Sequence, residues 1–440
     1  MTTKSLTLPW GQDSLHLTLP QRWNLKDILE PHPEPGVVDT TSEIRRALVN
    51  PIGSPTIAEL VQEMAGKAGR IAVVIDDDSR PTPVARILPT VLETLEAAGV
   101  ARDAITLVTA LGVHRPMRDE EVARRAGSTL EGLRWENHAC DDAERLVHLG
   151  TTERGTPVYV NRTVAEADLV LSIGCIEPHL IASFGGGYKN IVPGVAGQET
   201  VSHNHVLNCR ADTFNMVGQP IEHNAMRLDL EEAAGMVEAP VFIVNAVLNS
   251  QMEVVHVVAG HPIAAHRAGA EVSRRIYGVP VAAPADVVIA DSYPMDQDLR
   301  QGAKSIANTI RAVRKGGVLI VLMRAEEGLG VFGLADRKLP LGPRGLRIVA
   351  PLLVEIIPRV KLGSMPDDER FYLYFALQAM RHCHIYVYAP TIPAEARSGL
   401  PFVEFVESPA EALEKAEGRC PQADVLAFPH GGSTYPVIEI

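Results

Sequence analysis

The stretch that decides the fold is residues 71–99, IAVVIDDDSRPTPVARILPTVLETLEAAG. It opens with five apolar residues, 71–75, which have the length and composition of a buried strand. After a polar loop, residues 83–99 carry apolar side chains three and four positions apart and end at a glycine, the pattern of a helix with its C-cap. A strand followed by a helix is the repeating unit of an α/β fold with a parallel sheet.

The same alternation continues along the chain. Further strands are predicted at residues 104–111, 167–176, 239–248, 286–293, 316–323 and 384–390, with a hairpin near the N-terminus at 6–20 and a helix at 299–313. The Pro/Ala-rich stretch GVPVAAPAD, residues 278–286, indicates a domain boundary. We therefore predict two Rossmann-like α/β domains with mainly parallel sheets, residues 1–278 and 279–440. The last residues are expected to pack back on the first domain.

Composition excludes several classes of protein. The chain has 440 residues and a formal net charge of −13, without the basic stripe expected of a nucleic-acid-binding surface. Its longest apolar runs fall short of the roughly 18 to 20 residues of a membrane helix. The N-terminus lacks a signal-peptide pattern, so a cytoplasmic location is expected. The five cysteines show no CxxC spacing, which argues against a disulfide framework or a zinc ribbon.

Polar residues gather after the predicted strands, where ligands bind in doubly wound folds. Four loops stand out, and their polar residues are Asp76, Asp77, Asp78, Ser79 and Arg80; His114 and Arg115; Glu177, His179, Lys189, His203 and His205; and Asp296, Asp298, Arg300, Gln301 and Lys304. The sequence thus predicts one site assembled from several strand ends.

Each motif alone also has a structural explanation. Acidic residues after a strand often cap a helix, and a single histidine is often a hydrogen-bonded structural residue. His203 and His205 would share one face of a strand but not of a helix, so at most one is expected to bind metal. The sequence HCH at 382–384 leads into a strand and favours packing. FGGGYKN, residues 184–190, lacks the GxxxxGK[ST] pattern of a phosphate loop.

Taken together, these motifs resemble those of the lactate racemase family, nickel-dependent racemases and epimerases of 2-hydroxy acids. The resemblance rests on DDDSRPTP, GVHRP, IEPH followed by FGGGYKNIVPG, SHNH and QGAK, in family order between residues 76 and 304. The α/β pattern extends it over nearly the whole chain. The resemblance implies an isomerase acting on hydroxy acids.

The resemblance also implies a cofactor, a nickel-pincer nucleotide (pyridinium-3-thioamide-5-thiocarboxylic acid mononucleotide) bound covalently through Lys189. His205 matches the family's nickel ligand, which leaves His203 as a supporting or structural residue. Soft sulfur donors and one imidazole suit nickel. We expect a nucleotide lying against the backbone to need neighbours without side chains. The remaining residues expected at the cofactor are Asp77, Ser79, Arg80, Gly185, Gly186 and Gly187.

The implied mechanism is a hydride relay through a bound 2-keto acid. A proton acceptor is needed for each orientation of the hydroxyl group, and His114 and His179 answer that need. The substrate carboxylate is expected to be held by Arg80, Gln301 and Lys304. Because Gln301 and Lys304 come from the second predicted domain, the site is expected in the interdomain cleft, and maturation enzymes that build the cofactor are implied.

Substrate choice depends on Arg300. Lactate-specific members are expected to carry an aromatic residue directly before the QxxK glutamine, where this chain has Arg300. A cation there suits a second carboxylate and favours malate, unless Arg300 faces solvent or pairs with Asp296. Arg115 and Arg324 are other candidate partners of a larger acid. Lactate, or C2 epimerisation of a longer hydroxy or sugar acid, stays open.

Two other classes were weighed. A dehydrogenase using soluble nicotinamide nucleotide should have GxGxxG after its first strand, where this chain has DDDSRPTP. A non-catalytic ligand- or cofactor-binding protein could lack part of the set Lys189, His205, His114 and His179, and all four are present. The sequence gives no oligomeric state.

Overall fold

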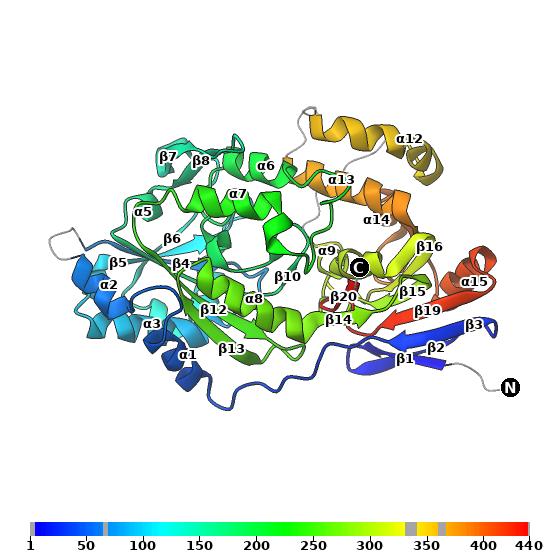
Figure 1. Cartoon of the computed structure of the whole chain (residues 1–440), viewed down its shortest axis with the longest axis horizontal. Helices are drawn as coiled ribbons and strands as arrows, with labels where there is room; N and C mark the ends of the chain where they lie inside the picture. The colour runs from blue at the N-terminus through cyan, green and yellow to red at the C-terminus, as the bar shows by residue number, and fades with distance from the viewer. Residues whose placement is uncertain (1–4, 65–68, 331–340, 360–366, 439–440) are drawn as a thin grey trace.

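The computed structural model describes residues 5–64, 69–330, 341–359 and 367–438. Two six-stranded sheets lie at opposite ends of the molecule, with helices on their faces (Figure 1). All neighbouring strands in both sheets are parallel except for one antiparallel pair, β12 and β13. The predicted α/β class with mainly parallel sheets is confirmed.

The first sheet is covered on both faces. Its strands are, in order, β13 (Val254–Gly260), β12 (Val241–Leu248), β9 (Leu169–Cys175), β4 (Ile71–Asp76), β5 (Ile105–Ala110) and β6 (Arg134–Asn137). Alternate residues of β4 enter different clusters: Val73 packs with α1 (Thr40–Val49), α2 (Ile57–Glu63) and α3 (Val84–Ala97), and Val74 packs with α6 (Gln198–Val206) and α7 (Ala225–Ala234). Burial on both faces explains why β4 is a continuous apolar run.

Shorter elements and one further helix complete this half. They are α4 (Asp119–Ala126), β7 (Leu146–Thr151), β8 (Pro157–Asn161), α5 (Arg162–Ala165), β10 (Pro178–His179), β11 (Ser183–Phe184) and α8 (Ala264–Tyr277). The strands β10 and β11 form a two-residue antiparallel pair directly before the glycine loop.

The second sheet has the order β18 (Glu404–Val406), β17 (His384–Tyr388), β16 (Val313–Leu322), β15 (Ala285–Asp291), β19 (Ala423–Phe428) and β3 (Trp23–Ile28). One face packs against the predicted hairpin, β1 (Ser5–Trp10) and β2 (Asp13–Thr18), and against α15 (Pro409–Arg419). The other packs against α10 (Lys304–Thr309) and the C-terminal part of α13 (Asp367–His382). A short helix, α14 (Ala394–Ser398), lies between β17 and β18 in the chain.

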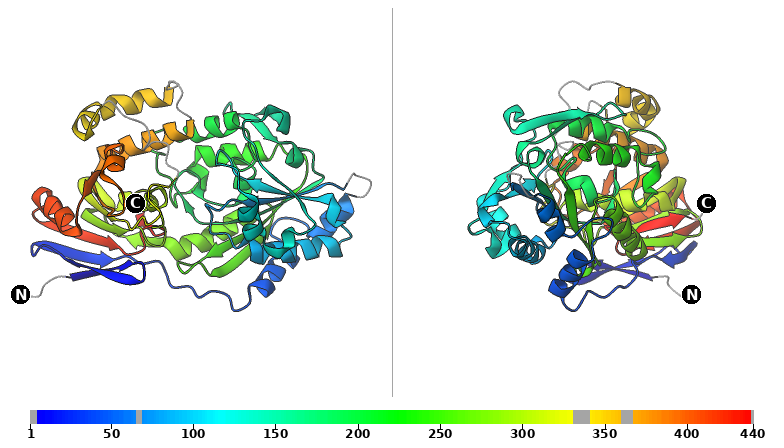
Figure 2. Two further views of the ribbon diagram at one scale, coloured as in Figure 1. Left: turned by 180° about the vertical axis from the view of Figure 1, so that it is seen from behind. Right: turned by 60° about the vertical axis from the view of Figure 1, so that its left-hand side comes forward.

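The two halves exchange segments, so the predicted division at residue 278 is wrong for the start of the chain. Strand β3 pairs with β19 of the second sheet, and the blue N-terminal strands lie beside it in Figure 1. In return, α12 (Pro343–Ile356) and α13 contribute to the core of the first half, and both views of Figure 2 show α13 beside α6. The strands β14 (Gly278–Val281) and β20 (Tyr435–Ile438) pair between the halves. Secondary-structure propensity depends on local sequence patterns, whereas these pairings join segments that are distant in the sequence.

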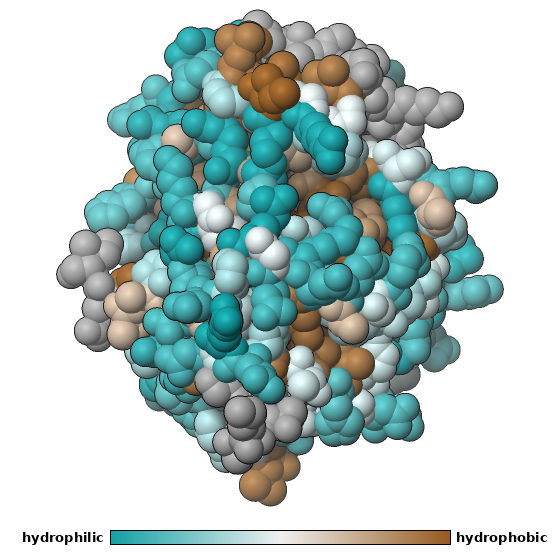
Figure 3. Space-filling view, turned by 90° about the vertical axis from the view of Figure 1, so that its right-hand side faces the viewer, coloured by the Kyte–Doolittle hydropathy of each residue, from teal (hydrophilic) through white to brown (hydrophobic). Residues whose placement is uncertain are grey.

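The face that carries the second sheet is mostly hydrophilic, with apolar groups at its top, where α12 lies in Figure 1 (Figure 3). Ile348 and Leu352 of α12 are 79% and 62% exposed. Among the residues that the structure describes, no helix combines the length and hydropathy needed to cross a membrane.

Candidate active site

The predicted site residues surround one cavity of about 320 Å³. It lies where the loops after β4, β5 and β9 meet α6, α9 (Leu299–Gly302), α10 and α13. The predicted residues that line it are Asp77, Ser79, Arg80, His114, His179, Gly185, Gly186, Lys189, His205, Arg300, Gln301 and Lys304. Gly187 is the one predicted residue that does not. Strand ends from both halves therefore converge as expected for parallel sheets.

His114 is held in one tautomer by two neighbours. Its Nδ1 lies 2.6 Å from Oδ2 of Asp77, and its Nε2 lies 3.1 Å from Nη2 of Arg300. An arginine only donates, so Nε2 accepts and the ring proton sits on Nδ1, facing the carboxylate. Burial raises the pKa of Asp77, but hydrogen bonds from His114 and Ser79 and the nearby Arg80 outweigh it and hold that pKa well below its ordinary value. His114 thus presents a lone pair to the cavity.

Arg80 has a protein partner. Its Nη1 donates to Oε1 of Glu177 over 2.9 Å, and both side chains are largely enclosed. Burial would raise the pKa of Glu177, but Lys304 and Arg80 outweigh it, so the carboxyl stays ionised. A substrate carboxylate must therefore share Arg80 with Glu177. No role was predicted for Glu177, although a charged residue directly after a buried strand was an available signal.

Ser79 serves Asp77 in this structure. Its hydroxyl and backbone N–H both donate to Oδ1 of Asp77, over 2.5 and 3.1 Å. The next helix, α3, begins only at Val84. Ser79 therefore supports the His114 partner, and its predicted contact with a nucleotide phosphate stays a prediction.

Lys189 and His179 face each other. The Nζ of Lys189 lies 2.7 Å from Nε2 of His179. The Nδ1 of His179 accepts the backbone N–H groups of Ile181 and Ala182, each over 3.2 Å, so in the neutral ring Nε2 carries the proton. That N–H can bond only to an unprotonated amine. Burial first, and then Arg80, lower the pKa of Lys189 well below its ordinary value, which agrees with a neutral, nucleophilic amine.

The glycines before Lys189 are explained by the protein itself. Gly186 and Gly187 have φ of +74° and +64°, where L side chains are strained. A Cβ at Gly186 would lie 2.6 Å from Asn245 Oδ1, and one at Gly187 would lie 2.5 Å from Arg227 Nη2. The loop therefore approaches its own scaffold too closely for side chains. Packing within the protein thus already excludes side chains at Gly186 and Gly187, and the contact of these glycines with a cofactor stays a prediction.

His205 and His203 lie on a helix, α6, and point to different partners. His203 Nδ1 lies 2.8 Å from the Thr156 hydroxyl, which donates to Asp229, so His203 anchors the helix. His205 lines the cavity, and its ring interacts with the backbone of Val201, one turn earlier on α6. Burial, followed by Lys189, lowers the pKa of His205 to about 4. Its ring is therefore neutral, the form in which imidazole binds metal.

The second half supplies cations. The predicted helix at 299–313 is interrupted: Arg300 and Gln301 lie on α9, and Lys304 begins α10. The pKa of Lys304 is lowered, mainly by burial and against the attraction of Glu177. Arg300 points to His114. The alternative pairing with Asp296 is wrong, because Arg324 lies there, with its Nη1 3.7 Å from Oδ2 of Asp296.

Two further arginines do not reach the cavity. Arg115 donates to both carboxylate oxygens of Glu121, each over 2.8 Å, and is 59% exposed at its side chain. Neither Arg115 nor Arg324 is among the residues that line the cavity. Among the described residues that line the cavity, the cationic side chains besides Lys189 are Arg80, Arg300 and Lys304.

Comparisons with known proteins identify the family of this chain. Residues 10–216 match the family model described as the lactate racemase N-terminal domain. The chain is 30% identical over 401 residues to lactate racemase of Lactiplantibacillus plantarum, covering 88% of this chain and 89% of the relative. This chain belongs to the lactate racemase family. It is thus an isomerase family member, as the motifs predicted.

Other relatives extend the likeness. Lactate racemase of Thermoanaerobacterium thermosaccharolyticum is 30% identical over 334 residues, 75% of this chain and 76% of the relative. The solved lactate racemase apoprotein from that organism superimposes with a TM-score of 0.82 at 26% identity, covering 99% of this chain and all of the other. A Thermotoga maritima protein, with a TM-score of 0.64 at 17% identity over 93% of this chain and all of the other, shares the fold.

The lactate racemase family uses a nickel-based cofactor, and the residues present fit such a group. Lys189 offers a neutral amine for attachment, and His205 offers a neutral imidazole. Both line the same cavity. Among the described residues, no group of three or more His, Cys, Asp or Glu side chains could hold a metal ion by itself. The donor set therefore suits a metal that brings further ligands of its own.

Proposed function

We propose that this chain inverts C2 of a small 2-hydroxy acid, with malate favoured, using a nickel-pincer nucleotide attached to Lys189. One observation carries the proposal: a base, His114, and a cation, Arg300, meet at 3.1 Å in the cavity that also holds the neutral Lys189. Membership of the lactate racemase family supports the reaction class. The choice of malate rests on Arg300.

Lys189 and His205 would hold the cofactor, the first by a covalent bond and the second as a nickel ligand. When bound, the group supplies an acceptor and donor of hydride for C2 of the substrate. The chain itself supplies binding, orientation and proton transfer. Enclosure between the two halves keeps water from the reacting carbon.

Proton transfer falls to the two histidines. His114, with its Nε2 lone pair toward the cavity and Asp77 behind it, accepts the hydroxyl proton of one enantiomer. His179 presents an Nε2–H group, and attachment at Lys189 removes the amine that this group contacts. Its Nε2–H group is then available to donate a hydrogen bond to the oxygen of the inverted substrate. For His179 to accept the hydroxyl proton in the opposite direction, its ring proton must first move to Nδ1, and Nδ1 must then give up its contacts with the backbone N–H groups of Ile181 and Ala182.

The carboxylates of malate have separate partners. Arg80 and Lys304, which both attract Glu177, hold the carboxylate next to C2, together with Gln301. Arg300 holds the distal carboxylate and leaves Nε2 of His114 free for the hydroxyl group. Without substrate, Arg300 thus donates a hydrogen bond to Nε2 of His114, the base, and it releases this atom when it binds the substrate carboxylate.

The test is chiral chromatography of L-malate and L-lactate incubated separately with cofactor-loaded protein, after loading has been checked by intact mass. Racemisation of malate at a rate at least tenfold that of lactate is expected. Racemisation of lactate alone would contradict the malate assignment but not the reaction. Loaded protein that inverts no 2-hydroxy acid would contradict the proposed function.

Lys189→Met removes the attachment point. The mass increase of the loaded protein should disappear and turnover should fall to background, because methionine fills the same space without an amine. Lys315→Met, in an exposed position, is the matched control and should keep both. An adduct on the Lys189→Met protein would contradict the assignment.

Arg300→Tyr tests substrate choice. The ratio of malate to lactate turnover should fall about tenfold, the effect of one lost charge-assisted contact of roughly 1.4 kcal/mol. Arg115→Tyr, at an arginine outside the cavity, should leave the ratio unchanged. An unchanged ratio in Arg300→Tyr would mean that another group reads the distal end of the substrate.

A longer 2-hydroxy acid is the second candidate substrate, because the cavity extends along an apolar wall. That wall contains Phe375, Leu400, Phe402 and Phe405. Including 2-hydroxyisocaproate and gluconate in the same chromatography distinguishes an apolar chain from a sugar acid. Faster inversion of 2-hydroxyisocaproate than of malate would favour the apolar wall over Arg300.

A further inference from the structure

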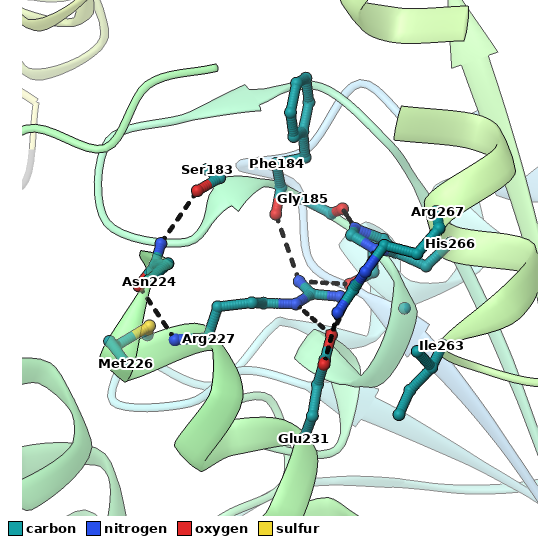
Figure 4. A network of polar contacts seen from close by, with 12 residues as sticks. Ser183, Phe184, Gly185, Asn224, Met226, Arg227, Glu231, Ile263, His266 and Arg267 are labelled. Carbon is teal, nitrogen blue, oxygen red and sulfur yellow. Dashed lines mark hydrogen bonds and ion pairs between the residues drawn. The ribbon is translucent and has the colours of Figure 1, made fainter. Parts of the chain in front are cut away.

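A buried polar network lies behind the glycine loop (Figure 4). Arg227 and Glu231 come from α7, and His266 and Arg267 come from α8. Arg227 and His266 are fully buried, and none of the four residues lines the cavity. Burying a guanidinium group is costly unless it is paired and hydrogen-bonded. The burial of these charged groups must therefore be explained by the structure around the network.

The explanation is that the network binds the backbone of the glycine loop. Arg227 Nη1 donates to the carbonyl oxygens of Phe184 and Gly186, over 3.3 and 3.2 Å. His266 Nε2 donates to the carbonyl oxygen between them, that of Gly185, over 2.9 Å. The His266 tautomer is fixed, because its Nδ1 accepts from Arg267 over 2.9 Å. Arg227 and His266 thus hold three successive carbonyl oxygens, and Figure 4 shows the contacts at Phe184 and Gly185.

The network also carries net charge. Glu231 accepts from Arg227 Nε over 2.6 Å and from both terminal nitrogens of Arg267 over 2.8 and 2.7 Å. Two guanidinium groups against one carboxylate leave one positive charge. Arg227 Nη2 has no hydrogen-bond partner in the described part of the chain and lies against Gly187, two residues before Lys189. The excess charge is therefore close to the lysine.

We propose that Arg227, Glu231, His266 and Arg267 are positioning residues for Lys189: they hold its loop by three carbonyl oxygens and place one uncompensated positive charge behind its amine. This rests on the proposed function, since it gives a reason for preparing Lys189 as the attachment residue. The consequence is an amine that faces the cavity unprotonated and is ready to form a covalent bond.

Other groups around Lys189 also affect the pKa of its amine. Burial and Arg80 lower its pKa, Arg227 does so as well, and Glu177 and Cys175 act in the opposite direction. His179 touches the amine, and His205 and His266 also interact with it electrostatically. Of these residues, only Arg227 and His266, which belong to the network, are replaced in the variants below. A shift in Lys189 reactivity can then be assigned to the changed charge.

The test is competitive labelling of cofactor-free protein with trace acetic anhydride between pH 5 and 11, with Lys189 acetylation quantified by peptide mass spectrometry. Arg267→Met, at a side chain that is about one third exposed, removes a positive charge and should move the labelling midpoint up by at least one pH unit. Glu231→Gln removes the negative charge and should move it down. Arg227→Met should act like Arg267→Met, whereas Arg227→Lys should retain most of the charge effect.

Opposite shifts cannot come from mere loosening of the loop, which would move every variant toward an ordinary exposed lysine. Equal midpoints in all variants, or shifts of one sign, would overturn the electrostatic part of the proposal. Arg45→Met, on the surface beside Glu93, is the charge control and should leave the midpoint unchanged.

Hydrogen exchange tests the hold on the carbonyl oxygens. Amides of residues 184–190 should exchange at least tenfold faster in His266→Ala than in the parent protein, while those of β4 should keep their protection. Unchanged exchange of the loop would overturn the structural part. Both experiments use cofactor-free protein. Their results therefore do not depend on whether the loading test with Lys189→Met supports or contradicts the proposed function.

Discussion

The carboxyl ends of β4 and β15 occupy matching places in the two sheets, and each strand ends in a buried aspartate. Asp76, after β4, accepts hydrogen bonds from Thr82 and from Arg125, whose side chain is largely buried with it. Asp291, after β15, accepts the backbone N–H of Tyr293 over 2.8 Å, and its Oδ2 has no partner among the described residues.

The pKa values follow from these surroundings. Burial raises the pKa of both carboxyl groups, and at Asp76 the guanidinium of Arg125 opposes that rise. Burial, with the neighbouring Asp296, raises the pKa of Asp291 to about 8. One strand end therefore holds a carboxyl group that is paired with a guanidinium group beside the chemistry, and the other holds a neutral acid. The same local sequence pattern, an apolar strand running into an aspartate, thus serves two electrostatic purposes.

The largest expected effect belongs to the first strand end. Asp77→Asn should lower turnover about a thousandfold, because an amide can donate to Nδ1 of His114 and turn the Nε2 lone pair away from its task. The measurement is the initial rate of malate inversion with equal cofactor loading. Two aspartates provide controls: Asp78→Asn, at an exposed neighbour, and Asp291→Asn, at the second strand end, should each stay within about twofold of the parent rate. A thousandfold loss in Asp291→Asn would erase the contrast between the two strand ends.

The next effect is on stability. Arg125→Met leaves Asp76 buried without its cation and should lower the free energy of unfolding by about 3–5 kcal/mol at pH 7, the usual result of breaking a buried pair. Urea unfolding followed by circular dichroism measures it. Adding Asp76→Asn to Arg125→Met should recover part of the loss, since the double variant no longer buries a charge. No recovery would mean that Arg125 acts mainly through its bonds to the backbone oxygens of Asp76 and Arg80.

Much of the first sheet could be predicted from sequence because its strands are buried on both faces and read as continuous apolar runs. The predicted strand 71–75 and helix 83–99 correspond to β4 and α3. The exchange of β3 into the second sheet could not be predicted, since its pairing with β19 joins residues some 400 positions apart. Hydrophobic periodicity carries no information on such partners.

The candidate site likewise has features that the sequence predicts and features that it does not. Residue types and motif order predicted which side chains meet, and twelve of the predicted residues line one cavity. Which of them pair was not predictable. The pairs Arg80–Glu177 and Arg300–His114 each join two different loops. They depend on side-chain directions that no spacing in the sequence encodes. Arg227 and His266 were missed because they contact the backbone of the site rather than its cavity.

The smallest effect belongs to the second strand end and has the opposite sign. The folded-state pKa of Asp291, about 8, lies above its ordinary value of 3.8, so the folded protein binds the extra proton between these values and loses stability as the pH rises through them. Asparagine imitates the neutral acid at every pH. Asp291→Asn should therefore raise the free energy of unfolding at pH 7 by about 2 kcal/mol, below the linkage limit of about 4 kcal/mol because its own amide N–H stays unpartnered.

The pH dependence separates this account from a simple change in packing. At pH 4 the parent carboxyl is protonated in the folded state and about half protonated in the unfolded state, so the advantage of Asp291→Asn should vanish there, and urea midpoints at pH 4, 6 and 8 follow the trend. Asp298→Asn, at the cap of α9, keeps its acceptor oxygen and should show no such trend. If Asp291→Asn were less stable than the parent protein at pH 8, Asp291 would be an ionised partner of Arg324, and the two strand ends would be electrostatically alike.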